Sequence, residues 1–129
     1  MLFRSAVTSF TVVTSPLKAV RDAEFFLREL EQRKFRVSSL IVNRVWPRLQ
    51  LPTADGLAAG NLSDESRQLL QGTIDWYGAV SSSHQTVWNH LQSSLGTRVE
   101  RLAQVPELPE DIAGLPALQH IAQQLGDCA

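Results

Sequence analysis

The sequence predicts an α/β fold in which helices cover a sheet of parallel strands. Three observations indicate this: a β-branched run that ends in turn residues, an amphipathic segment after it, and a second strand with an unbroken apolar centre. A strand, a helix and a strand in this order form a right-handed unit with parallel strands. The full order is β-α-β-helical insert-β-α. We interpret it as a single α/β domain over residues 1–129, with a loop and helical insert at residues 48–96.

The composition is that of an ordinary folded domain. Of the 129 residues, 43% are hydrophobic and 19% are charged, and the formal net charge is -1. This balance excludes general nucleic-acid binding, which requires a dense basic surface. The one cysteine, Cys128, cannot form a disulfide within the chain, which is typical of a reducing compartment. No apolar run approaches the roughly 18 to 20 residues of a membrane span, so we expect a cytoplasmic protein without stable membrane insertion.

The first strand and the first helix are predicted within residues 9–34. Residues 9–16, SFTVVTSP, form a β-branched and aromatic run that ends in turn residues. Ser15 followed by Pro16 is typical of a helix start, because serine caps free N–H groups and proline fits the first helical position. Over residues 17–34, apolar side chains recur every three or four positions, which predicts an amphipathic helix.

The second strand, residues 36–45, contains the most informative stretch of the chain. Residues 40–42, Leu-Ile-Val, form an apolar run of the kind that is buried on both faces of a sheet. Asn43 and Arg44 follow this run directly. Because ligands bind beyond the carboxyl ends of the strands in open parallel sheets, we expect Asn43 and Arg44 to face a ligand.

The remaining elements follow from turn residues and periodicity. Residues 48–62 have the composition of a loop, and residues 63–95 are largely helical, with a break or kink favoured by Gly78 and the Ser-Ser-Ser-His run that follows it. A third strand is predicted around residues 99–105, ended by Pro106, and a last helix from Pro116 to Gly126. The loops after the three strands are then candidates for ligand binding: residues 14–16, 43–44 and 106–107.

Three stretches of the chain resemble a known family. FTVVTSPLKAVRDAEFFLREL and VSSLIVNRVWP, residues 10–30 and 37–47, resemble the C-terminal half of the ArsA-type anion-transporting ATPases. This family belongs to the deviant P-loop ATPases, with the MinD and ParA partition proteins. Residues 100–126, ERLAQVPELPEDIAGLPALQHIAQQLG, resemble the closing strand, loop and helix of the family. The resemblance spans roughly residues 8–126 and implies part of a Rossmann-like P-loop NTPase sheet with ATP as its ligand.

The sequence departs from the family in one large respect. It contains neither the glycine-rich phosphate loop, G-K-G-G-x-G-K-[ST], nor the switch aspartates of the family. The residues that bind phosphate and Mg²⁺ and orient the attacking water then have to come from outside this chain. The resemblance therefore implies a C-terminal ATPase segment without catalytic residues of its own, which works with a missing N-terminal half or with a homodimer partner.

The resemblance also implies roles for single residues. The family's asparagine at the end of the V-N strand lies beside the nucleotide base, a role that Asn43 matches, and a side-chain amide offers adenine both a donor and an acceptor. Arg44 would contact the base or the sugar, and Pro106 with Glu107 would close over the other side of the base. Each also has a purely structural interpretation: Asn43 as a turn cap, Arg44 as a solvated side chain, and Pro106 as a strand-ending proline.

Two further features leave the function open. His84 and His90 do not predict a metal site, because a spacing of six places them on opposite sides of a helix. Trp76 and Trp88 fit either packing within the helical insert or an apolar lining for a protein client. The alternative function is a non-enzymatic interaction module that dimerises through its sheet edge or its helices.

Overall fold

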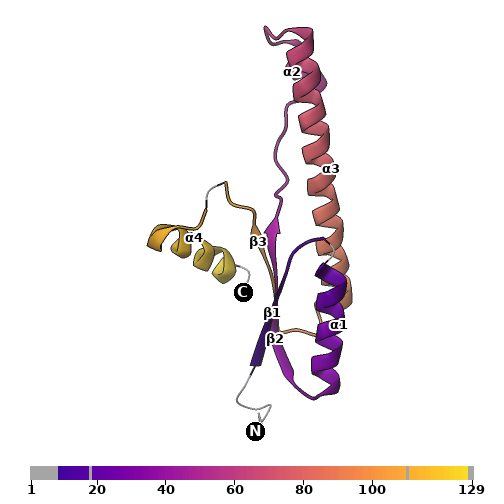
Figure 1. Ribbon diagram of the computed structural model, residues 1–129, viewed down its shortest axis with the longest axis vertical. Helices are drawn as coiled ribbons and strands as arrows, with labels where there is room; N and C mark the ends of the chain where they lie inside the picture. Colours follow the sequence, from indigo (N-terminus) through magenta and orange to yellow (C-terminus); the bar gives the residue numbers. More distant parts are fainter. Residues whose placement is uncertain (1–8, 18, 110, 128–129) are drawn as a thin grey trace.

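The computed structural model describes residues 9–17, 19–109 and 111–127, so Cys128 lies outside the described residues. Within these residues the protein has a three-stranded parallel sheet and four helices (Figure 1). The strands lie in the order β1 (Ser9–Thr14), β2 (Arg36–Val45) and β3 (Arg101–Pro106). The helices are α1 (Ala19–Gln32), α2 (Ala54–Ala58), α3 (Asp64–Leu95) and α4 (Gly114–Asp127). The predicted α/β class with parallel strands is confirmed.

The centre of the core is β2, which pairs with both other strands. Its side chains alternate between the two faces of the sheet, and Leu40 and Val42 are completely buried. They belong to one apolar cluster with Leu27 of α1 and with Leu91 and Leu95 of α3. Figure 1 shows α1 and α3 on this side of the sheet and α4 on the opposite side. The uninterrupted apolar run of β2 thus reflects a strand between two helical layers.

The second face of the sheet is covered unevenly. Helix α4 packs on β3, where Ala103 and Val105 are buried. Val13 of β1 lies on the same face, because it pairs with Ile41 and Ile41 pairs with Ala103. Its side chain is 59% exposed. The described residues therefore cover this face at β3 and leave it open at β1.

The start of α1 differs from the prediction. The helix begins at Ala19, so the predicted helix start at Ser15 and Pro16 is wrong. These two residues lie in the bend between β1 and α1, and Pro16 is buried. The first turn closes later, where the N–H of Val20 donates to the carbonyl of Leu17 at 3.2 Å. Burial of the proline ring, rather than its helix preference, decides its position.

The end of α1 is a Schellman turn that directs the chain into β2. The N–H of Phe35 donates to the carbonyl of Leu30, and that of Lys34 to Glu31, both at 2.9 Å. Lys34 adopts a φ of 60°, the left-handed conformation that this turn requires. Phe35 then packs edge-on against Phe10 of β1, with 5.4 Å between the ring centroids.

Helix α3 is continuous over 32 residues, so the predicted break at Gly78 and the serine-rich run is wrong. Ser63 caps it, accepting the N–H of Ser66 at 3.2 Å. Ser81 and His84 are buried against the segment after β2, and these contacts hold the run helical. At 1.5 Å per residue the helix is about 48 Å long. Figure 1 shows that its N-terminal half, with α2, extends beyond the sheet.

The predicted loop before α3 contains the short helix α2. Thr53 caps this helix by accepting the N–H of Gly56 at 3.2 Å. None of the helices formed by the described residues combines the length and the apolar character needed to cross a membrane.

The turn after α1 predicts a stabilising substitution. Lys34→Gly removes the Cβ that disfavours the left-handed conformation and should raise the free energy of unfolding by about 0.5 to 1 kcal/mol. Urea denaturation measures this change. Lys34→Ala keeps a Cβ and serves as the control. An equal gain in both variants would contradict the proposed origin of the effect.

The continuity of α3 is testable at Gly78. A Cβ added at this residue meets no heavy atom within 4 Å, so Gly78→Ala should stabilise the protein by about 0.8 to 1 kcal/mol through helix propensity alone. Thermal or urea unfolding reports the change, and Gly72→Ala, which is equally unhindered, should give a similar gain. A loss of stability at Gly78 would indicate a kink there.

Candidate functional site

The predicted site residues of β2 lie in a β-bulge. Val42 pairs with Gln104 and Val45 pairs with Pro106, so β2 contains one more residue than β3 over this stretch. Arg44 takes up the extra length with a φ of 62°. The strand continues through Asn43 and Arg44 to the buried Val45, over the predicted range of residues 36–45. The bulge turns Asn43 and Arg44 outwards at the carboxyl end of the sheet.

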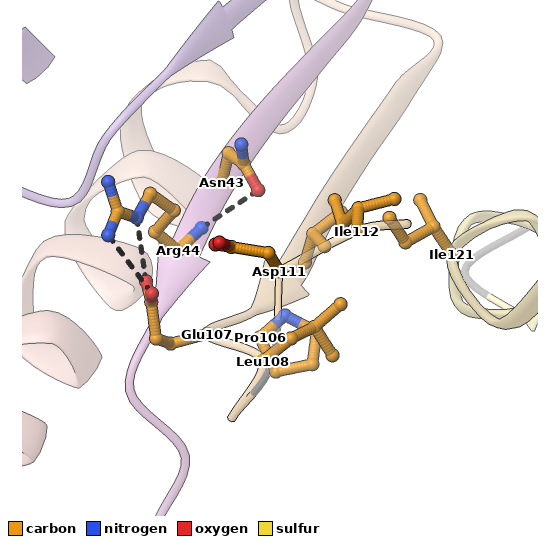
Figure 2. Close-up of a pocket in the computed structure, with 9 residues that line it drawn as sticks. Asn43, Arg44, Pro106, Glu107, Leu108, Asp111, Ile112 and Ile121 are labelled. Carbon is orange, nitrogen blue, oxygen red and sulfur yellow. Dashed lines mark hydrogen bonds and ion pairs between the residues drawn. The ribbon is translucent and has the colours of Figure 1, made fainter. Parts of the chain in front are cut away.

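A bidentate ion pair joins the two predicted loops. The Arg44 guanidinium donates to Glu107 through Nε at 2.8 Å and through Nη2 at 3.0 Å (Figure 2). The backbone N–H of Glu107 also donates to the carbonyl of Val45 at 2.9 Å. Glu107 is thereby fixed to β2 through both its backbone and its side chain. Two parallel N–H···O bonds from arginine to a carboxylate give a geometry that lysine cannot provide.

All four predicted site residues line one cavity of about 230 Å³. Asn43 and Arg44 come from the bulge of β2, and Pro106 and Glu107 from the end of β3. The rest of the lining comes from Val105 and Leu108, and from residues that the sequence had not singled out: Asp111, Ile112 and Ile121. Figure 2 shows the apolar side chains on the α4 side of the cavity and the polar groups on the β2 side.

The hydrogen bonds of Asn43 leave part of its side chain available. Its Oδ1 accepts the backbone N–H of Arg44 at 3.0 Å, which helps to hold the bulge. A side-chain amide has two further N–H groups to donate. The side chain is exposed and borders the cavity, so it acts as a turn cap and can at the same time present a donor to a ligand.

The site carries slightly more negative than positive charge. One guanidinium, of Arg44, stands against the two carboxylates of Glu107 and Asp111. The hydrogen bonds from Arg44 hold the pKa of Glu107 below its usual range. The same hydrogen bonds raise the pKa of Arg44, to which Asp111 also contributes by charge attraction. A fully ionised pair that is already satisfied has little remaining attraction for an anion.

The third predicted loop does not join this cavity. Ser15 and Pro16 border a separate open hollow between α1 and α3, together with Ser83 and Val87 of α3. The three strand-end loops thus lie at the same rim of the parallel sheet, but the loop after β1 does not line this cavity. The other two loops do so, because β2 and β3 are neighbours that end in line, whereas the loop after β1 turns under α3.

The two histidines of α3 have different surroundings. His84 is buried and its Nδ1 accepts the backbone N–H of Trp46 at 2.9 Å. His90 is exposed and lies 3.0 Å from a carboxylate oxygen of Glu24 on α1. Among the described residues, no group of three or more histidine, cysteine, aspartate or glutamate side chains is arranged to hold a metal ion.

The residue patterns missed four residues in or beside the site: His84, Asp111, Ile112 and Ile121. His84 was read as part of a break in the helix, although its spacing from Val80 and Leu91 already places it on the apolar face of α3. Asp111 and Ile112 fall in a loop between the last strand and the last helix, where no periodicity exists. Their place beside Arg44 is decided by the packing of α4 on β3.

Two comparisons with known proteins were made for this chain. No protein-family model matches the chain, and a search of curated proteins found no match. The function is therefore inferred from the site itself.

The Arg44–Glu107 pair predicts a measurable pKa change. Arg44→Gln removes the guanidinium that stabilises the carboxylate, so the pKa of Glu107 should rise towards its ordinary value of 4.5. NMR titration of the Glu107 carboxyl carbon measures this. Arg48→Gln, at an exposed arginine four residues along the chain, is the matched control and should leave the pKa unchanged.

The sign of the pH dependence follows from the same shift. Because the pKa of Glu107 is lower in the folded protein than in the unfolded chain, the pair stabilises the fold above a pH of about 4.5. This contribution is lost as the pH falls through the lowered pKa. If Arg44→Gln leaves the pKa of Glu107 unaltered, the two side chains are not paired in solution.

Proposed function

We propose that this chain supplies the wall around the adenine base in an ATP site, as the C-terminal segment of an ArsA-like ATPase. In this proposal the sheet is part of a Rossmann-like P-loop NTPase fold. Helices α2 and α3 form an insert that binds a client or a partner. Phosphate binding and Mg²⁺ are assigned to residues outside this chain, because the sequence contains no glycine-rich phosphate loop. The chain is then not hydrolytic by itself.

The observation that carries the proposal is the meeting of two strand-end loops in one cavity. Open parallel sheets bind ligands beyond the carboxyl ends of their strands. The cavity lies at such ends, with Asn43 and Arg44 from β2 on one side and Pro106 and Glu107 from β3 on the other. It also has the make-up of small-molecule sites, in which apolar walls carry a few orienting polar groups.

The chemistry of the cavity suits a base better than a phosphate. Arg44 is already paired with Glu107, and Asp111 adds a second carboxylate, so an anion would be repelled rather than bound. An uncharged planar base meets no such cost. It can lie against the apolar groups of Pro106, Leu108 and Ile112, while Asn43 donates a hydrogen bond to a ring nitrogen.

The uncovered edge and face of the sheet at β1 support the proposal that the chain binds a partner. Only one edge of β1 is paired within the described residues, and Val13 is exposed on the face opposite α1. Phe26 of α1 is 52% exposed. It is two positions from Glu24, which faces α3 through His90, and so points away from α3. A missing ATPase half or a homodimer partner that continues the sheet would cover both side chains.

The alternative is a non-enzymatic interaction module, and one observation favours it. The projecting half of α3 exposes large apolar side chains, among them Leu69 and Trp76. Trp88, in contrast, packs against the core cluster. Exposed leucine and tryptophan on an arm that extends past the sheet are typical of a protein-binding surface. In that case the cavity beside Arg44 has no ligand.

A nucleotide titration separates the two functions. A fluorescent ATP analogue should bind saturably, and Asn43→Ala should abolish or strongly weaken binding by removing the donor to the base. Asn89→Ala, at an exposed asparagine of α3 far along the chain from the cavity, is the matched control. Fluorescence anisotropy measures the binding of the analogue to the original protein and to both variants.

Competition defines which part of the nucleotide is bound. If the cavity holds the base, adenosine should displace the analogue about as well as ATP does, and tripolyphosphate should not displace it. Absence of saturable binding would refute the nucleotide proposal and leave the interaction module. Displacement by tripolyphosphate alone would contradict the assignment of the cavity to the base.

A further inference from the structure

The segment that follows the site is fastened to α3 by side chains of three successive turns. Trp46 and Pro47 continue directly from β2, and their carbonyls accept hydrogen bonds from α3. Ser81 Oγ donates to Pro47 at 3.1 Å and to Trp46 at 3.4 Å, and the Tyr77 hydroxyl donates to Pro47 at 2.9 Å. The ring of Trp46 stacks on Tyr77, with 5.0 Å between their centroids. The contact is therefore both polar and aromatic.

His84 accepts a hydrogen bond from the backbone N–H of Trp46 in the same segment. Its Nδ1 accepts the Trp46 N–H at 2.9 Å, so in the neutral ring the proton is on Nε2. The residue is 3% exposed, and Nε2 has no hydrogen-bond partner among the described residues. The second proton of an imidazolium would occupy Nδ1, and that atom could no longer accept. The bond to Trp46 thus exists only while the ring is neutral.

This bond is separated from the candidate site by one residue. Trp46 follows Val45, and the carbonyl of Val45 accepts the N–H of Glu107 at 2.9 Å. On the other side of Val45 lies Arg44, whose guanidinium binds the same Glu107. The backbone from the bulge to Trp46 is thus held at Glu107 on the β3 side and at His84 on the α3 side.

We infer that His84 is a positioning residue, which couples the place of α3 to the geometry of the Arg44–Glu107 cavity through the Trp46 amide. This inference rests on the proposed function, because it concerns regulation of the proposed base site. A displacement of α3, or a proton on His84, releases Trp46 and lets the bulge relax. Helix α3 extends beyond the sheet, so a partner that binds its projecting half would act on the cavity by displacing this helix.

Burial, rather than the charge of the surrounding groups, opposes the protonation of His84. Burial lowers its pKa from 6.5, and the charge of Glu107, across from it on the loop after β3, acts in the opposite direction with a smaller effect. Glu107 is itself neutralised by Arg44 on β2. Asp111, on the loop before α4, acts on Arg44. The contribution of the neutral ring to stability is complete above a pH of about 6.5 and is lost as the pH falls through the lowered pKa.

The test uses the full chain labelled with ¹⁵N-tryptophan. Trp76 and Trp88 have their amides inside α3, whereas the Trp46 amide bonds the titrating nitrogen itself, so the amide signal of Trp46 should shift the most when His84 is protonated. His84→Asn places an oxygen on Cγ where His84 has Nδ1, and should keep the bond while abolishing the titration. His84→Leu removes the acceptor. His90→Asn, at the exposed histidine of the same helix, is the matched control and should leave the titration intact.

Binding of the fluorescent ATP analogue gives the second readout. His84→Leu should weaken binding about tenfold, and His84→Asn should restore it to within about threefold of the original protein. A Trp46 amide signal that does not titrate with His84, or equal binding by His84→Leu and the original chain, overturns the inference. If no variant binds the analogue, the base site itself is refuted, and the Trp46 titration then decides whether His84 holds the segment. If His84→Leu does not fold, the inference is tested by the Trp46 amide titration, which the original chain should show and His84→Asn should lack.

Discussion

The position of β2 between two parallel neighbours is the constraint on which the rest of the structure depends. Both edges of the strand are hydrogen-bonded, and the completely buried Leu40 and Val42 anchor α1 and α3 to one face. A parallel arrangement places the ends of β2 and β3 at the same rim. The loop after β3 can therefore reach back to β2, where Glu107 bonds both the carbonyl of Val45 and the side chain of Arg44.

The bulge in β2 gives this rim its chemistry. A regular strand would alternate Asn43 and Arg44 between opposite faces of the sheet. With Arg44 in the left-handed region, both side chains border one cavity while Val45 returns to the core. Residues that occupy such conformations are held there by their surroundings, and they concentrate at binding sites. Here the surroundings are the Asn43 side chain, Glu107 and, one residue further, the bond between Trp46 and His84.

Helix α3 connects two regions with different properties. Its C-terminal half buries Leu91 and Leu95 in the core, and its N-terminal half carries exposed apolar side chains beyond the sheet. Between them, Tyr77, Ser81 and His84 occupy one face and bind the segment that leaves the site. An uninterrupted helix transmits a displacement along its whole length, which a kinked one would absorb. Helix α3 thus joins the projecting apolar surface to the segment that leaves the cavity.

Local pattern in the sequence determined the class of the fold. The apolar centre of β2, the periodicity of α1 and Pro106 at the end of β3 each express a local preference that the fold retains. The two parallel pairings follow from the order of the elements. Asn43 and Arg44 were recognisable as candidate site residues because polar groups directly after a buried apolar run stand out, and both line the cavity. The tertiary structure alone decided the bulge, the continuity of α3 through its serines, and the burial of Pro16 and His84. In each case the local preference was outweighed by contacts with residues far away in the chain: Ser81 and His84 found partners in Trp46 and Pro47, more than thirty positions earlier.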